Sequence, residues 1–332
     1  SQLNRIDGVN AKSFRTVYSY VFFVESTSDL IFPDSEFGHV LRVRAPYTLN
    51  TVTSVVGYLT GQTVKTDGPL FRTISYGVWG NTAGDVFFTD HDRGLVMRIS
   101  QYGQFVSAIA GLGVSSCVSS TGVIATTTSI CTPRGIVGDT LGNIYFSEYS
   151  NHRVRRVSTS GVLTTVMGFG GCGYSPGYMG VGSGAYVCYP GALAMDPSTN
   201  NMIYVAVTYG GSSSYVTLGS WRISDDYYET VFGNDNGGGT GGGYRRKLLE
   251  EAQSVKLEAM LPAQMHEQWY VAPYYVYSMS SIWVAPSGVI YFADSSSVRV
   301  YWFNKVTGAM GIGAGVGSYG APTENGSSTS VS

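Results

Sequence analysis

Apolar residues recur along the chain in short runs that are separated by glycine and small polar residues. The clearest stretch begins at Pro133 and ends at Gly168. It contains a small apolar segment, a glycine turn, a β-rich segment that ends in Glu148, a segment of alternating basic and apolar residues, and a last segment that ends in glycine. Apolar and polar positions that alternate with a period of two predict half-buried β-strands. We therefore predict four consecutive strands between residues 133 and 168.

Less regular copies of the same succession recur in other parts of the chain. Repeats of four strands arranged around a channel are the architecture of a β-propeller. We predict that residues 1–332 form a single all-β domain, a β-propeller of four-stranded blades with five blades readable. Residues 234–280 read as one helical and aromatic insertion, and a sixth blade hidden there is the alternative. The five predicted blades span about 14–57, 78–111, 133–168, 190–233 and 281–315.

One copy of the repeat is specific enough to suggest a family. Gly142-Asn-Ile-Tyr-Phe-Ser-Glu148, followed by Asn151-His-Arg153, resembles an NHL repeat almost position for position. With the less regular copies the resemblance covers most of the chain, and it implies the propeller fold. The chain departs from the family pattern in its long loops between blades. We expect its particular function in those loops, because loops carry binding residues more often than the scaffold does.

The resemblance also raises the question of catalysis, because some propellers of this architecture are enzymes. Amidating lyases, sugar-lactonase-like and strictosidine-synthase-like propellers are examples. The lyases use several histidine ligands to zinc, with Arg and Tyr at the reacting centre. The four histidines of this chain, His39, His91, His152 and His266, lie at non-equivalent places of the repeat and do not resemble a converging set. The site residues of the other enzymes have no match in this chain. We therefore predict no catalytic residue, no catalytic metal and no enzymatic activity.

Composition excludes some classes of partner. Charged residues make up 13% of the 332 residues and hydrophobic residues 43%, so the chain can build a large core with few surface charges. The formal net charge of -2 gives no field that would attract nucleic-acid phosphates, and we expect no nucleic-acid partner. The longest apolar runs, such as Val21–Val24, are far shorter than the roughly 20 residues of a membrane span.

The four cysteines form two closely spaced pairs. Cys117 and Cys131 enclose one polar loop, and Cys172 and Cys188 enclose another. A zinc site would show closer Cys spacing and nearby His partners, and both are missing here. We predict two disulfides, Cys117–Cys131 and Cys172–Cys188, and therefore an extracellular or cell-surface location. Four buried free thiols remain the alternative.

Acidic residues recur at fixed places in the repeat. Asp90, Glu148 and Asp294 each end the second strand of a copy, and we expect them to fix the following turn by accepting backbone N–H groups. Asp139 and Asp196 follow first strands, where turn chemistry is expected and a structural Ca²⁺ ion is the alternative. We predict no other cofactor.

Covalent glycans are expected because Asn325 begins the chain's Asn-Gly-Ser sequon, the acceptor sequence for N-glycosylation. Candidate assembly elements are the two termini, which together read as one inter-blade linker, and the helix and the aromatic block of the insertion. Their residues are Ser1, Gln2, Leu3, Asn4, Val331, Leu248, Leu249, Trp269, Tyr270, Tyr274 and Tyr275.

These patterns favour a non-catalytic extracellular structural, assembly or adhesion module, such as the self-assembling subunit of an extracellular filament or surface coat. The expected partners are copies of the chain itself, arranged head to tail, and other extracellular proteins or glycans. One alternative is a monomeric ligand-binding or sensor ectodomain. A metal-dependent lyase or hydrolase is the other.

Overall fold

The structure is a computed structural model, and it describes the chain as two compact units, Ser1–Thr165 and Val166–Ser332. Within the described residues, no helix is long and apolar enough to cross a membrane. The described residues are 9–10, 22–24, 29–34, 39–43, 51–56, 75–100, 106–173, 179–210, 215–233, 270–271 and 276–315.

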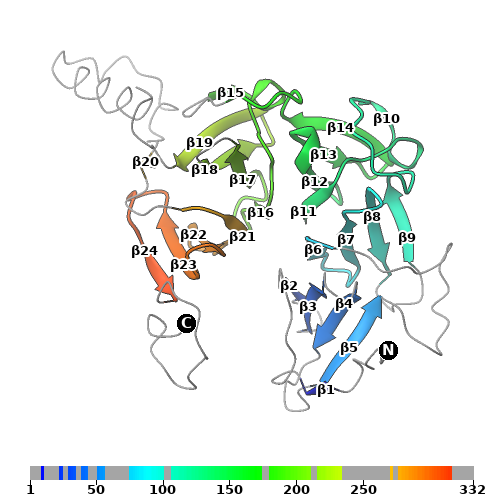
Figure 1. Ribbon diagram of the computed structural model, residues 1–332, viewed down its shortest axis with the longest axis horizontal. Helices are drawn as coiled ribbons and strands as arrows, with labels where there is room; N and C mark the ends of the chain where they lie inside the picture. Colours follow the sequence, from blue (N-terminus) through cyan, green and yellow to red (C-terminus); the bar gives the residue numbers. More distant parts are fainter. Residues whose placement is uncertain are drawn as a thin grey trace. The chain divides into compact units, whose positions relative to one another are not determined.

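The first unit contains three sheets (Figure 1). The first sheet has the order β1-β5-β4-β3-β2 and comprises β1 (Val9–Asn10), β2 (Phe22–Val24), β3 (Asp29–Asp34), β4 (His39–Val43) and β5 (Thr51–Val56). The second has the order β6-β7-β8-β9 and comprises β6 (Val78–Gly80), β7 (Val86–Asp90), β8 (Leu95–Ile99) and β9 (Val106–Ala110). The third has the order β10-β14-β13-β12-β11 and comprises β10 (Val123–Ile124), β11 (Pro133–Gly138), β12 (Ile144–Glu148), β13 (Arg153–Val157) and β14 (Val162–Met167).

The second unit contains two sheets. The fourth sheet follows the order β15-β19-β18-β17-β16, with β20 also on β19, and comprises β15 (Met179–Val181), β16 (Leu193–Met195), β17 (Met202–Tyr209), β18 (Tyr215–Arg222), β19 (Tyr227–Gly233) and β20 (Tyr270–Val271). The fifth has the order β21-β22-β23-β24 and comprises β21 (Met279–Val284), β22 (Val289–Asp294), β23 (Arg299–Asn304) and β24 (Met310–Ala314). Three short 3-10 helices complete the described elements, η3 (Ala125–Thr127), η4 (Tyr149–Asn151) and η5 (Gly182–Gly184).

Every sheet is built on four strands that follow one another in the chain and pair antiparallel. The turns between them carry the residues that tight turns require. Between β11 and β12, Gly142 has a φ of +88°, a backbone conformation that residues with a side chain rarely adopt. Its N–H donates to the carbonyl of Asp139 at 3.1 Å and closes the turn. Local turn chemistry thus sets the meander that the hydrophobic pattern predicts.

Two loops between sheets add a further strand to the sheet that follows them. β10 pairs antiparallel with β14, and β15 pairs antiparallel with β19. Each loop therefore runs to the fourth strand of the next sheet before it returns to begin that sheet's first strand. These loops are the two that contain the cysteine pairs.

Apolar faces of neighbouring sheets pack on each other within each unit. In the first unit one cluster joins the second and third sheets and includes Phe87, Ile136 and Phe146, all buried. In the second unit the ring of Phe232 lies 5.3 Å from that of Phe292 and 4.9 Å from that of Phe303, measured between centroids, and joins the fourth and fifth sheets. Burial of such rings contributes about 1.5–3 kcal/mol each.

The predicted fold class is confirmed: the chain is an all-β protein with a β-propeller. The blade count differs slightly from the prediction, with four blades counted against the five predicted. Of the five sheets, the first is described mainly by its backbone, with side chains only at residues 30–31 and 40–43. Most of the predicted insertion 234–280, and with it the helix and the alternative sixth blade, lies outside the described residues.

Candidate functional site

Acidic residues at the ends of second strands bind backbone N–H groups. Asp294 accepts hydrogen bonds from the N–H groups of residues 296 and 297, in the turn that follows, at 3.0 and 3.3 Å. It also accepts from those of residues 277 and 278, just before β21, at 3.0 and 3.1 Å. Asp90 accepts from the N–H of Arg93 at 3.3 Å. The turn role expected from the sequence is present, and at Asp294 the carboxylate also fastens the segment that enters the sheet.

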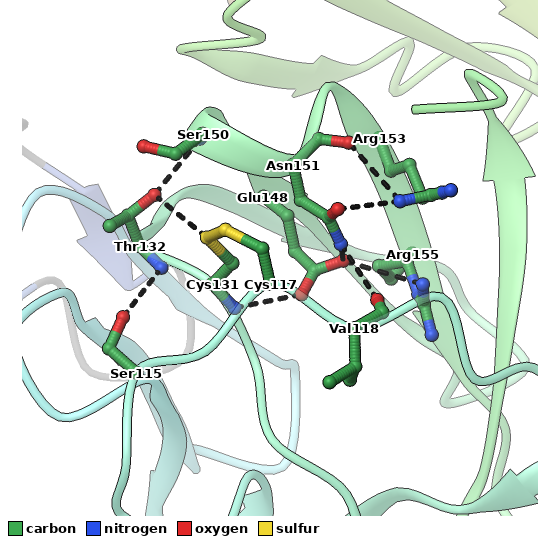
Figure 2. Close-up of a disulfide and its surroundings, with 10 residues drawn as sticks. All are labelled: Ser115, Cys117, Val118, Cys131, Thr132, Glu148, Ser150, Asn151, Arg153 and Arg155. Carbon is green, nitrogen blue, oxygen red and sulfur yellow. Dashed lines mark hydrogen bonds and ion pairs between the residues drawn. A yellow bond between two sulfur atoms is a disulfide. The ribbon is translucent and has the colours of Figure 1, made fainter. Parts of the chain in front are cut away.

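Glu148 likewise fastens a segment that enters its sheet, here the first disulfide loop, between Cys117 and Cys131 (Figure 2). Its Oε1 accepts a hydrogen bond from the backbone N–H of Cys131 at 2.9 Å. Its Oε2 accepts one from Nδ2 of Asn151 at 2.9 Å and lies 3.4 Å from Nη1 of Arg155. The side chains of Glu148 and Arg155 are each 1% exposed, so this is a buried ion pair.

Burial dominates the ionisation of this pair. Burial raises the pKa of the Glu148 carboxyl, and the charge of Arg155 and the Cys131 N–H oppose the rise. Burial likewise lowers the pKa of Arg155, against the attraction of Glu148. Removing an ion from water costs several kcal/mol, so each charge depends on the other. The pair is closed to solvent and serves to position the loop.

The loop between Cys117 and Cys131 is fastened to the third sheet by the same group of side chains. The disulfide brings the two Cα atoms to 4.6 Å. Three consecutive loop residues, 118–120, each receive a hydrogen bond from a side chain at the end of η4 or in β13. The bonds run from Asn151 Nδ2 to the Val118 carbonyl at 2.9 Å, from Arg153 Nη2 to Ser119 Oγ at 3.3 Å, and from Arg155 Nη2 to the Ser120 carbonyl.

Directly after this loop, Arg134 lies in β11 with its guanidinium beside two tyrosines. Its Cζ atom is 3.3 Å from the ring centroid of Tyr149 and 5.0 Å from that of Tyr76. The side chain is half-buried, and its Nε is buried with no hydrogen-bond partner among the described residues. Cation–π attraction of this kind contributes about 0.5–2 kcal/mol, depending on desolvation. Arg134 is therefore a positive charge held in one place.

His91 also contacts Tyr76. Its ring packs edge-on against Tyr76, with 4.9 Å between the ring centroids. Its Nδ1 is 3.0 Å from Oδ1 of Asp92. An ionised carboxylate can only accept, so Nδ1 carries the hydrogen and Nε2 is the nitrogen that can take up a proton. The His91 side chain is 20% exposed, so the protein does not enclose it fully.

The topology explains why these residues meet. Tyr76 and Arg134 lie at the starts of first strands, and His91 and Tyr149 follow the ends of second strands; in an antiparallel pair these places adjoin. The hydroxyl of Thr89 donates to the carbonyl of Arg134 at 2.8 Å and ties the two sheets together there. Gly77 is required beside this bond, because a Cβ at that position would collide with the same carbonyl.

The turn that carries His91 also packs against the disulfide loop. Gly94, at the end of this turn, has a φ of +61°, and a Cβ there would overlap backbone atoms of Ser115 and Ile130 in the loop. The loop therefore contacts the turn of His91 and leads directly into Arg134. We name Tyr76, His91, Asp92, Arg134 and Tyr149 the open cluster, in contrast to the closed Glu148–Arg155 pair.

The two aspartates that follow first strands serve their own turns. Asp139 accepts hydrogen bonds from the N–H and Nδ2 of Asn143 at 2.8 and 2.7 Å and from the hydroxyl of Tyr145 at 2.9 Å. Asp196 accepts from the N–H and Oγ of Ser198 at 2.9 and 2.6 Å. Across the described part of the chain, no group of three or more His, Cys, Asp or Glu side chains is placed to hold a metal ion. The described geometry therefore gives these aspartates turn chemistry.

The second disulfide loop is held by uncharged groups. The Cα atoms of Cys172 and Cys188 are 4.8 Å apart across the bridge. The hydroxyl of Tyr209, at the end of β17, donates to the carbonyl of Tyr186 in the loop at 2.9 Å. The Tyr186 ring packs edge-on against Phe169, with centroids 4.9 Å apart. Both predicted disulfides are thus present, with different surroundings.

For the other predicted site residues the structure describes no side chain. Tyr270 is described by its backbone alone, as part of β20. The remaining predicted glycosylation and assembly residues lie outside the described residues, namely Ser1, Gln2, Leu3, Asn4, Leu248, Leu249, Trp269, Tyr274, Tyr275, Asn325 and Val331.

The open cluster was missed from the sequence, although the repeat contains a signal for it. Tyr76 and Arg134 each precede the glycine whose N–H binds a second-strand hydroxyl, at 3.1 Å for Gly77 and 2.9 Å for Gly135. His91 and Tyr149 each follow the acid that ends a second strand. The cluster is therefore formed by the same two repeat positions in two consecutive copies, filled with different residues.

No protein-family model and no curated protein matches the chain. Solved structures do match in fold. A streptogramin B lyase aligns with a TM-score of 0.50 at 12% identity, over 94% of this chain and 72% of the lyase. A gluconolactonase from Xanthomonas campestris aligns with a TM-score of 0.50 at 14% identity, over 90% of this chain and 75% of the gluconolactonase. A nidogen/laminin complex gives 0.51 at 12% identity, over 83% of this chain and 74% of that chain.

These findings correct two predictions made from the sequence. The chain was predicted to be a non-catalytic assembly or adhesion module and not an enzyme, and both predictions are contradicted, because two of the three similar folds belong to proteins named as enzymes. The prediction rested on the scattered positions of the four histidines and on a scaffold role for the repeat. At 12–14% identity the likeness itself establishes the propeller fold.

Proposed function

We propose that the chain is an extracellular NHL-type propeller enzyme that opens ester or lactone bonds with His91 as its general base. The observation that carries the proposal is the hydrogen bond between His91 and Asp92, which leaves Nε2 as the proton acceptor in a ring that packs against Tyr76. The two disulfides support an oxidising, extracellular setting. The names of the lyase and the gluconolactonase with similar folds support an enzyme of this broad kind.

The proposed reaction assigns one task to each side chain of the open cluster. Nε2 of His91 accepts a proton from a water molecule, whose oxygen forms a bond to the carbonyl carbon. The single bond between that carbon and the ester oxygen then breaks. The leaving alkoxide takes the proton back from His91, and the products are a carboxylic acid and an alcohol. Asp92 holds the imidazole in the required tautomer and stabilises its protonated form.

Hydrolysis of a panel of activated esters and small lactones by the full, disulfide-bonded chain tests the proposal. Replacing His91 by Asn is expected to lower kcat by about 10²–10⁴-fold, the usual contribution of a general base. His152→Asn is the matched control, since His152 lies in the same unit but outside the open cluster, and kcat should be unchanged. A wild-type chain that opens none of these substrates, or an H91N variant as active as the wild type, would refute the assignment.

A further inference from the structure

Arg134 is a fixed cation without a described counter-charge. Its guanidinium makes no hydrogen bond or ion pair with any of the described residues. Only Nε is both buried and unpartnered, so the two Nη nitrogens reach solvent. The surrounding carboxylates already have partners: Oδ2 of Asp90 lies 3.8 Å from Nη1 of Arg93, and Asp92 pairs with His91. The positive charge of Arg134 is therefore available to a ligand.

The two tyrosines decide how a ligand can approach this charge. The Tyr149 ring covers one face of the guanidinium at 3.3 Å, and the Tyr76 ring lies 5.0 Å from the same carbon. With the Tyr149 ring against it, the guanidinium presents its Nη edge to a ligand, where its N–H donors point in a planar fork. That fork matches the two oxygens of a carboxylate, and a side chain already held in place loses little rotamer freedom when it binds one.

We infer that Arg134, flanked by Tyr76 and Tyr149, is a carboxylate-binding subsite. The assignment of a substrate class rests on the proposed function: the ester or lactone that His91 attacks carries a separate carboxylate, which Arg134 anchors. The Tyr76 ring touches both residues and sets the spacing between the anchored group and the reacting bond. Small organic acids that contain an ester fit this description, and neutral esters lack the anchored group.

Protection of Arg134 from an arginine-specific dicarbonyl reagent tests the subsite without any need for turnover. The probes are benzoate and its neutral isostere benzamide, and peptide mass spectrometry reads the modification rate. Benzoate should slow the modification of Arg134 several-fold, and benzamide should leave it unchanged. Arg98, which is paired with Asp85 at 2.7 Å and is 46% exposed, serves as the internal reference and should respond to neither probe. Equal protection by both probes, or none, overturns the inference.

Two further arms sharpen the result. Inorganic phosphate at the same concentration and ionic strength should protect less than benzoate, and equal protection would overturn the assignment to a carboxylate. Arg134→Gln should weaken benzoate binding, followed by ligand-observed NMR, by about tenfold or more, because a hydrogen bond to a charged group is lost. Arg134→Lys should retain part of the binding, because it keeps the charge without the fork.

The subsite and the reaction can fail separately. If benzoate protects Arg134 but no ester or lactone is opened, the proposed function falls and the anion subsite stands. If neutral esters are opened by His91 with a KM that Arg134→Gln does not change, the reaction stands and the subsite falls. In the first case the H91N variant should still bind benzoate, because His91 is not part of the carboxylate contact.

Discussion

The two disulfide loops occupy equivalent places in consecutive repeats and are built alike. Each begins after the fourth strand of one sheet, adds a short strand to the next sheet and continues into a 3-10 helix, η3 or η5. Each is closed by a bridge between its two ends, with sequence separations of 14 and 16. Their architecture is therefore shared, and the difference between them lies in the side chains that fasten them.

In the first loop the end of the second strand supplies a buried carboxylate, and in the second loop it supplies a phenol. Glu148 accepts the N–H of Cys131 and depends on the buried Arg155 for its charge, whereas the hydroxyl of Tyr209 donates a neutral hydrogen bond to the carbonyl of Tyr186. The charged Glu148–Arg155 pair makes more hydrogen bonds and fixes more residues of its loop. Loss of one member of the pair, however, lowers the free energy of unfolding strongly. The loop that this pair fastens also borders the open cluster, where fixed geometry matters most.

The largest difference between the loops should appear when these fastening residues are replaced. Glu148→Ala is expected to lower the free energy of unfolding by about 3–5 kcal/mol, because it leaves the Arg155 charge buried without a partner. Tyr209→Phe, its counterpart, should cost about 1 kcal/mol, since it removes one neutral hydrogen bond. Urea denaturation followed by tyrosine fluorescence measures both values.

A double variant checks that the buried charge is the cause. Glu148→Met combined with Arg155→Met removes both charges, and its unfolding free energy should lie closer to that of the wild type than the value for Glu148→Ala. A double variant as unstable as the single one would show that packing, and not charge, dominates at this place.

Opening the bridges should give a smaller effect that is nearly equal in the two loops. Replacing both cysteines of either pair by Ser should cost about 3 kcal/mol, because loops of such similar length restrict the unfolded chain to the same extent. The local response should differ. Hydrogen exchange of the N–H at position 131 should stay slow without the bridge, since Glu148 still accepts its hydrogen bond, whereas exchange in the loop of Tyr186 should rise. Equal exchange in the two opened loops would contradict the comparison.

The smallest effect concerns pH and the first loop only. Burial, aided by the charge of Arg153, lowers the pKa of His152 below its usual 6.5. The unfolded chain therefore binds this proton at a higher pH than the folded chain, so stability is present above about pH 6.5 and falls as the pH drops below it. His152→Asn should flatten this slope between pH 7 and 5, and Asn tolerates the φ of +53° at this position. An unchanged slope in thermal unfolding would count against a role for His152.

Much of the fold was predictable because it rests on local signals. Glycine turns such as Gly142 and the alternation in residues 144–157 act through neighbours in sequence, and they identify the strands and their order. The disulfides were predictable because the spacing of the four cysteines and the lack of nearby His argue against a zinc site. The added strands β10 and β15 were not predictable, since strands as short as Val123–Ile124 show no alternation of apolar and polar residues.

The open cluster is harder to predict because its members meet only through pairing between strands and packing between sheets. Arg134 precedes a glycine and His91 follows an acid, and each fact alone suggests turn chemistry. Their meeting depends on the bond from Thr89 to the Arg134 carbonyl, which spans two sheets. An alignment of the second and third repeats would have shown that these two positions change, while the glycine and the second-strand hydroxyl stay.

The added strands also determine which sheet edges could recruit another chain. An exposed edge strand offers unpaired N–H and C=O groups on which a foreign strand can grow, and proteins suppress aggregation by covering such edges. β10 covers part of β14, and β15 and β20 together cover much of β19. Among the fourth strands of the described sheets, β9 and β24 carry no added strand. A lysine or proline placed on β9 or β24 should therefore lower intermolecular β-pairing at these edges at high concentration.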